Sequence, residues 1–342
     1  MPDPPDYPKH RPAISPPVPA RGSGYASPGA RKERLKKRTY RKLPAAAAPY
    51  AELHAVSAFS FLEGASLPED LIQRAAELEL PAVALIDRNG VYGAPRFYQA
   101  AKQAGIKALV GAEVVLEDDG QVSPGRQAGH RPLGLVPEPR PTANRGAEGA
   151  EPGRLTLLVA SREGYRNLCR ILTTAARGRP KGEAAADWEL LAAHAGGLRC
   201  LTGGEEGPLA RTLAAEGPEA ARRLLERLQA TFPGRVHVEL QRHRQRDEEH
   251  RNQALLDLAR RLRLPVVATN GVRYARPEDK PLHDVLTSLR HHTHLDAAGR
   301  LLAAHRERHL KTAADMARAF PELPGAVAAA AELAASLDFT LA

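Results

Sequence analysis

The feature that most constrains the fold of this chain is an alternation of strand-like and helix-like segments between about residues 50 and 270. Short apolar runs of strand length are followed by stretches whose apolar residues recur at helical spacing. This alternation is typical of a parallel sheet that is covered by helices. We therefore predict a closed or nearly closed (β/α)7 barrel, with a doubly wound open sheet as the alternative. The predicted strands are residues 51–57, 81–87, 106–116, 154–160, 197–203, 236–243 and 264–270.

Local signals indicate where several of the intervening helices begin and end. Ser66 followed by Glu69, with Pro68 in the first turn, predicts a capping box at the start of the helix in residues 66–80. Gly105 predicts the end of the helix in residues 94–105, and Ser161 predicts the start of the helix after the fourth strand. Further helices are predicted in residues 218–232 and 247–262.

Changes in composition divide the chain into three parts. Residues 1–48 are rich in proline and basic residues, which predicts a disordered tail. Residues 49–275 are the predicted barrel, in which residues 117–153 lack periodicity and predict a flexible surface insertion. Residues 276–342 turn alanine-rich and predict a C-terminal helical segment.

The net charge of +9 belongs almost entirely to the tail. Residues 1–42 hold eleven basic and three acidic residues, whereas the remainder holds 38 basic and 37 acidic residues. A dense basic block of this kind predicts non-specific binding of DNA or another polyanion, and a solvated leader without a specific role is the alternative. The basic candidates are Arg31, Lys32, Arg34, Lys36, Lys37, Arg38, Arg41 and Lys42.

The rest of the composition bears on compartment. No apolar run reaches the length of a membrane span, and no signal-peptide pattern opens the chain. Cys169 and Cys200 lie far apart in unrelated contexts, which argues against a disulfide or zinc framework. We expect a cytoplasmic protein without membrane partners.

Candidate chemical groups lie where predicted strands end. Parallel barrels carry their functional residues at the carboxyl ends of the strands. His54 ends the first strand, Glu63 follows in the loop, Asp87 follows the second strand and Glu113 lies in the third. All four side chains are acceptable ligands for a divalent metal such as Mn, Zn or Mg.

Seven motifs together resemble one family: LHAVSAFSFLEGAS, ALIDRNGVYGAPRF, GAEV, LTLLVASREGYRNL, LTGGEEGPLA, VELQRH and ATNGVRYARPEDKPLHDVLTSLR. With these motifs the chain resembles, over about residues 50–342, the PHP (polymerase and histidinol phosphatase) domain, in the form that opens the error-prone alpha subunit of bacterial C-family DNA polymerase. The resemblance implies a distorted seven-stranded barrel that in active members holds two or three metals and cuts phosphoesters.

The same resemblance implies that most metal-ligand positions are lost. The family pattern keeps His54, Glu63, Asp87 and Glu113 as residual ligands. At the remaining ligand positions this chain has Val56, Arg88, Arg154, Gly203 or Gly204, Gly271 and Arg273.

Three of the replacements are arginines, which has a physical consequence. A guanidinium group is always protonated, so it repels a divalent cation and attracts carboxylates. We expect Arg88 or Arg273 to form salt bridges with Glu113 or Asp87 that fill the former metal site, so no bound cofactor is expected. The alternative is one metal that is still held by His54, Glu63 and Glu113.

These expectations lead to two hypotheses about function. The first is the N-terminal part of an error-prone DNA polymerase III alpha subunit, acting in replication and translesion synthesis as a structural or interaction module with a degenerate metal site. The second is a residual metal-dependent phosphoesterase or 3′–5′ exonuclease. The polymerase palm of the family lies beyond the resemblance, so we expect little activity from the chain alone. A separate polymerase polypeptide and other translesion or replisome components are then its expected partners, besides DNA.

Two other basic stretches have simpler interpretations. His291, His292 and His294 form a histidine tract after the barrel, where a polar helix end is the better interpretation. Arg242 to Arg246 form a basic loop after the sixth strand, which predicts either a solvated loop or a nucleic-acid contact.

Overall fold

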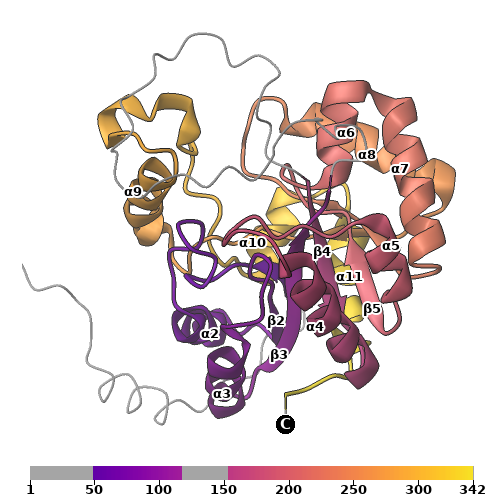
Figure 1. Cartoon of the computed structure of the whole chain (residues 1–342). Helices are drawn as coiled ribbons and strands as arrows, with labels where there is room; N and C mark the ends of the chain where they lie inside the picture. Colours follow the sequence, from indigo (N-terminus) through magenta and orange to yellow (C-terminus); the bar gives the residue numbers. More distant parts are fainter. Residues whose placement is uncertain (1–48, 118–152, 342) are drawn as a thin grey trace, which may run out of the picture. The chain divides into compact units, whose positions relative to one another are not determined.

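A computed structural model describes residues 49–117 and 153–341 of the chain (Figure 1). The predicted basic residues of the tail and most of the predicted insertion lie outside these ranges. Within the described ranges, no helix combines the length and the apolar character that a membrane crossing needs.

The described core is one seven-stranded sheet in which every strand lies beside its sequence neighbour. This sequential order confirms the predicted α/β architecture and differs from a doubly wound sheet. The sheet curls until Val272, just after the last strand, forms a parallel bridge with Ala55 of the first strand. The strands are β1 (Glu52–Ala55), β2 (Ala82–Leu85), β3 (Lys107–Val115), β4 (Arg154–Val159), β5 (Leu198–Leu201), β6 (Val236–Leu240) and β7 (Val266–Ala268).

One strand contradicts the prediction of a wholly parallel sheet. β4 is antiparallel to both β3 and β5, whereas the other neighbouring pairs are parallel. Val115 at the end of β3 pairs with Arg154 at the start of β4, so the two strands meet as in a hairpin. An antiparallel neighbour can be reached without a crossover helix, and the strand-like pattern of residues 154–160 is the same in either direction.

Helices cover the strands of the sheet, and α2 and α3 lie beside β2 and β3 in Figure 1. Gly105 ends α3 in the left-handed conformation, and the Ser161 hydroxyl accepts a hydrogen bond from the backbone N–H of Gly164 at the start of α4; both predictions are confirmed. The helices up to β7 are α2 (Pro68–Glu77), α3 (Ala94–Ala104), α4 (Arg162–Ala176), α5 (Trp188–Ala193), α6 (Pro208–Glu216), α7 (Pro218–Thr231) and α8 (Glu248–Leu262).

The predicted capping box of α2 is wrong. Leu67 is the residue that precedes the helix, and its apolar side chain cannot accept a hydrogen bond from the first backbone N–H groups of the helix. The Ser66 hydroxyl instead accepts a hydrogen bond from the backbone N–H of Ala275, at 2.8 Å. The hydroxyl that the local pattern assigns to the start of α2 therefore binds a backbone group about 200 residues away in the sequence.

After β7 the chain is helical, as the sequence predicts for residues 276–342. The segment contains α9 (Lys280–Arg290), α10 (Ala313–Ala319) and α11 (Pro324–Ala335), together with short 3₁₀ turns at Pro277–Asp279, Leu295–Ala297 and Gly299–Leu301. The apolar α11 packs against β7 and β1, where the two ends of the curled sheet meet. Burial of its apolar side chains there covers the seam between the first and last strands.

Candidate functional site

The direction of the strands brings the predicted site residues to one end of the sheet, called the mouth below. His54 lies in β1, Glu113 lies in β3, and Asp87 and Arg88 follow β2. Because β4 runs in the opposite direction, its first residue, Arg154, lies at the same end as the carboxyl ends of the other strands. Arg88 and Glu113 form a parallel bridge there.

The carboxylate of Glu63 lies among several guanidinium groups. Its closest partners are Arg154 Nη1 at 2.5 Å and Arg88 Nη1 at 2.7 Å. Arg290 Nη1 lies at 3.5 Å and Arg273 Nη1 at 3.8 Å. Glu63 and Arg154 are almost completely buried, whereas Arg88 is partly exposed. Glu63, which the sequence analysis predicts as a residual metal ligand, therefore binds cationic side chains.

Arg273 and Arg154 also bind two further carboxylates. Arg273 Nη2 lies 2.5 Å from Glu206 and 3.5 Å from Glu113, and Arg154 Nη1 lies 3.3 Å from Glu206 and 3.6 Å from Glu113. Burial alone would raise the pKa of both carboxyl groups. Arg273 and Arg154 together with the other neighbouring cations outweigh the effect of burial, so the pKa of Glu113 falls to about 2 and that of Glu206 falls well below its usual range. Both groups are therefore carboxylates at neutral pH.

Sequence reasoning missed Glu206. It lies in the stretch Gly203 to Gly207, which precedes α6, only two residues after a predicted lost ligand position, Gly204. Its partners come from β4 and from the segment after β7, so no local spacing identifies it. The acidic pair Glu205–Glu206 between glycines was the only available signal.

His54 is enclosed by carboxylates on both sides of its ring. Its Nε2 lies 3.1 Å from Glu113, and its Nδ1 lies 2.8 Å from Glu239. Glu239 also accepts hydrogen bonds from the Gln241 amide and the Thr269 hydroxyl. Burial alone would lower the pKa of His54, but Glu239 and Glu113 outweigh it and raise the pKa to about 10. An imidazolium has no lone pair to offer a metal.

Asp87 is held differently from the prediction. It accepts hydrogen bonds from the Ser57 hydroxyl at 2.9 Å, from the Ser57 backbone N–H at 2.8 Å and from the Ser60 hydroxyl at 2.9 Å. No arginine pairs with it among the described residues. Burial raises its pKa and these donors oppose that effect. Of the predicted salt bridges, Arg273 with Glu113 is found, whereas the pairing of Asp87 with either arginine is wrong. Arg88 pairs with Glu63 instead.

Sequence reasoning missed Gln241, whose side chain lies beside two glycines, Gly204 and Gly271, that stand at predicted lost ligand positions. A Cβ placed on Gly204 would come within 2.2 Å of the Gln241 side chain, and one on Gly271 within 2.5 Å. Gly271 also adopts a φ of +54°, which favours glycine. Val56 is fully buried and apolar. These three positions therefore offer no donor, and Gln241 fills the gap that two of them leave.

Little space remains between the charged groups of the mouth. The cavity that His54, Glu113, Arg154 and Arg273 line has a volume of about 10 Å³, which is at most the room of one water molecule. In the part of the chain that the structure describes, no three His, Cys, Asp and Glu side chains form a group able to hold a metal ion. The ion pairs themselves fill the mouth.

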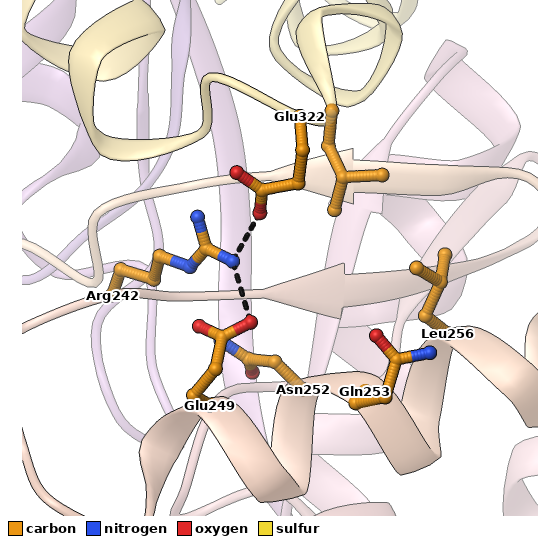
Figure 2. Close-up of a pocket in the computed structure, with 7 residues that line it drawn as sticks. Arg242, Glu249, Asn252, Gln253, Leu256 and Glu322 are labelled. Atoms are coloured by element: carbon orange, nitrogen blue, oxygen red, sulfur yellow. Dashed lines mark hydrogen bonds and ion pairs between the residues drawn. The ribbon is translucent and has the colours of Figure 1, made fainter.

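The basic loop after β6 contacts other elements of the fold through Arg242. Figure 2 shows Arg242 between Glu249 of α8 and Glu322, which precedes α11. Arg242 also donates to the carbonyl oxygen of Ala319 at 2.7 Å and lies over the ring of Phe320. The charge of Arg242 is therefore already paired, which weakens the prediction that this loop contacts nucleic acid.

Most of the chain is similar in sequence to known proteins. Residues 52–243 match the family model of the PHP domain. The chain is 41% identical over 299 residues to an error-prone DNA polymerase of Mycolicibacterium paratuberculosis and 38% identical over 301 residues to one of Anaeromyxobacter sp. strain K, matches that cover 86% and 85% of this chain. It spans only about a quarter of the length of these relatives, 25% and 23%. An amidohydrolase structure from Chromobacterium violaceum aligns at 16% identity with a TM-score of 0.43, covering 66% of this chain and 88% of that one, a likeness too distant to bear on function.

Proposed function

Because the chain belongs to the PHP domain family, we propose that it is the PHP module of an error-prone DNA polymerase in which arginines have replaced the metal ions. In this proposal the module is catalytically inactive. It acts as a structural and interaction domain in DNA replication, translesion synthesis and DNA repair. The second half of the proposal rests on relatives of which the match to this chain spans only about a quarter.

The observation that carries the proposal is the network of buried ion pairs at the mouth. Glu63 and Glu113 occupy positions that the family pattern gives to ligands, and both bind the arginines found at other ligand positions. Buried carboxylates need a counter-charge, which a metal supplies in active members and guanidinium groups supply here. The site thus keeps its electrostatic balance without a metal.

The donor set does not fit a divalent cation. Lone pairs of Glu63 and Glu113 face Arg154 and Arg273, and His54 is held as an imidazolium between two carboxylates. A metal would have to displace these partners and would meet their positive charge. We therefore derive no catalytic step through a metal.

Metal content and activity test this proposal together. The purified chain, incubated with excess Mn²⁺ or Zn²⁺ and then dialysed, is expected to retain far less than one equivalent by elemental analysis. It is expected to hydrolyse neither bis-p-nitrophenyl phosphate nor the 3′ end of a single-stranded oligonucleotide. Stoichiometric metal together with hydrolysis that disappears in His54→Ala would overturn the proposal.

The second candidate function is a residual phosphoesterase with one metal. It is favoured by a single observation, the convergence of His54, Glu113 and Glu63 around the same arginines. A matched pair of variants separates the two candidates. Arg273→Gln removes one cation and Glu113→Gln removes one carboxylate. If a metal is bound, Glu113→Gln weakens it and Arg273→Gln strengthens it, whereas the arginine-filled site shows no metal in either case.

A further part of the proposal concerns DNA. Non-specific binding is assigned to the basic residues between Arg31 and Lys42, and the support is their charge density in the sequence. A separate polymerase polypeptide and other translesion or replisome components remain the proposed protein partners. The cytoplasm remains the proposed location.

A further inference from the structure

The exposed large apolar side chains are confined to two stretches of the described chain. They lie in residues 59–92, on the loops that follow β1 and β2, and in residues 282–301, on α9 and the 3₁₀ turns after it. The outer surfaces of α3 to α8 carry none in this class. The side chains are Phe59, Phe61, Leu67, Tyr92, Leu282, Val285, Leu289, Leu295 and Leu301.

On α9 these side chains form a regular stripe. Leu282, Val285 and Leu289 are 43%, 43% and 55% exposed and recur at i, i+3 and i+7, so they lie on one face of the helix. Only Thr287 and Ser288 of α9 are buried. The helix thus buries two hydroxyl side chains and exposes three of its apolar side chains to solvent, the reverse of an ordinary surface helix.

Direct contacts join the two stretches. Arg290 at the end of α9 pairs with Glu63 in the loop that carries Phe61, at 3.5 Å. Ser66, in the same loop, binds the backbone N–H of Ala275 and lies 3.5 Å from Asp279, the residue before α9. The loops and the helix are therefore held together beside the mouth, and we call their exposed apolar residues the α9 surface.

We propose that the α9 surface docks the part of an error-prone polymerase that corresponds to the remaining three-quarters of the long relatives, an inference that rests on the proposed function. Two observations support this partner, the length of the relatives and the apolar character of the α9 surface. Relatives about 40% identical to this chain extend over roughly four times the length it spans. A regular stripe of exposed apolar side chains beside exposed aromatic side chains is typical of an interface rather than of a free surface.

The chemistry of the α9 surface describes what the partner presents. An apolar groove that accepts anchors at i, i+3 and i+7 fits the stripe, as in other helix-in-groove complexes. Exposed polar side chains, including His292, His294 and Arg300, lie on the segment that follows α9 and suit the hydrated rim of an interface. Arg88 and Arg290 both pair with Glu63 and so connect the helix to the loop that carries Phe61.

Co-purification tests the docking. This whole chain, carrying an affinity tag, is co-expressed with the Mycolicibacterium paratuberculosis relative from which the matching quarter has been removed, so that both polypeptides fold in each other's presence. The wild-type chain is expected to retain the partner in a 1:1 complex. The triple variant L282S/V285S/L289S is expected to retain at least about tenfold less, because buried apolar anchors dominate such interfaces. Its melting temperature should match the wild type, since the three side chains are exposed.

The control is R223S/E226S on the exposed face of α7, which should retain the partner fully. If the wild type retains no partner, the proposed interaction role fails. If the triple variant retains as much partner as the wild type, the α9 surface is wrong and the proposed function stands. If sedimentation shows that the chain alone is a dimer and that the triple variant is a monomer, a second copy covers the surface and the inference is overturned.

Discussion

At the scale of single residues, the mouth shows how buried carboxylates and buried arginines balance each other's charge. Arg154 is the largest fully buried side chain described, and a lone guanidinium could not be accommodated at that depth. It is tolerated because Glu63, Glu113 and Glu206 surround it. The carboxylates and the arginines therefore depend on each other, so removing one member leaves the others buried without a partner.

The first prediction concerns Arg273, which is almost completely buried beside Glu113 and Glu206. Arg273→Ala is expected to lower the free energy of unfolding by on the order of 3–5 kcal/mol, because it leaves carboxylates unpaired. Arg88 is partly exposed, so Arg88→Ala should cost less. Urea denaturation measures both.

The matched control for these variants is Arg260→Ala, which breaks an exposed pair with Asp257 and should change stability by about 0–1 kcal/mol. An effect of Arg273→Ala as small as that of the control would mean that the buried network contributes nothing to stability.

The second prediction concerns the charge of His54. Its pKa in the folded chain is raised from 6.5 to about 10, so folding favours the imidazolium. The resulting stabilisation is complete below pH 6.5 and is lost as the pH rises through about 10. We expect nitrogen NMR to show a doubly protonated His54 ring at about pH 8, where an ordinary histidine is neutral.

Stability against pH gives an independent measurement of His54. The wild type should lose stability between about pH 7 and pH 10, and His54→Gln should flatten this part of the curve. A neutral His54 ring at about pH 7, or the same slope in both proteins, would contradict the assignment.

At the scale of elements, two features decide where the site groups meet. The reversal of β4 places Arg154 at the mouth; in a parallel β4 it would lie at the opposite end of the sheet. Arg242 then ties the end of β6 to α8 and to the segment between α10 and α11 (Figure 2). Since α11 covers the seam between β7 and β1, this one side chain supports the closure of the curled sheet.

The third prediction concerns this tie. Arg242→Ala should increase amide hydrogen exchange several-fold in α10 and α11, because it removes two ion pairs and the bond to Ala319. Exchange in β2 and β3, which lie away from these contacts, should be unchanged. Arg244→Ala is the control, since Arg244 is largely exposed and pairs only with Glu307 among the residues described. Equal exchange in the wild type and in Arg242→Ala would mean that apolar packing alone holds α11.

At the scale of the whole molecule, charge is divided between the tail and the rest of the chain. Residues after Lys42 carry 38 basic and 37 acidic residues, so the net charge of +9 comes almost entirely from residues 1–42. Many of the arginines in the described ranges are also paired with carboxylates. Any strong attraction for DNA should therefore come from the tail.

The fourth prediction follows from that division. A chain that begins at Ala45 should lose most of its affinity for DNA of any sequence while its melting temperature barely changes. For the full chain, contacts from the eight basic residues between Arg31 and Lys42 would give a salt dependence with a slope of up to about −7. Fluorescence anisotropy with random-sequence DNA measures both effects.

The matched control replaces the same eight side chains with glutamine in the full chain, which separates charge from length. If the shortened chain binds DNA as tightly as the full chain, the contact surface lies within residues 45–342. Arg246 would then be the first residue to mutate, since Arg242 is already paired.

The sequence alone determined the strand–helix order, the positions of the seven strands and the pairing of Arg273 with Glu113. These features are encoded locally, in apolar periodicity and in residue types at strand ends. Only the tertiary structure decided the direction of β4, the entry of Glu206 and Gln241 into the site, and the partners of Asp87 and Ser66. Strand periodicity is the same in both directions, and a buried polar group takes whichever partner the folded chain brings within hydrogen-bonding distance, however far away that partner lies in the sequence.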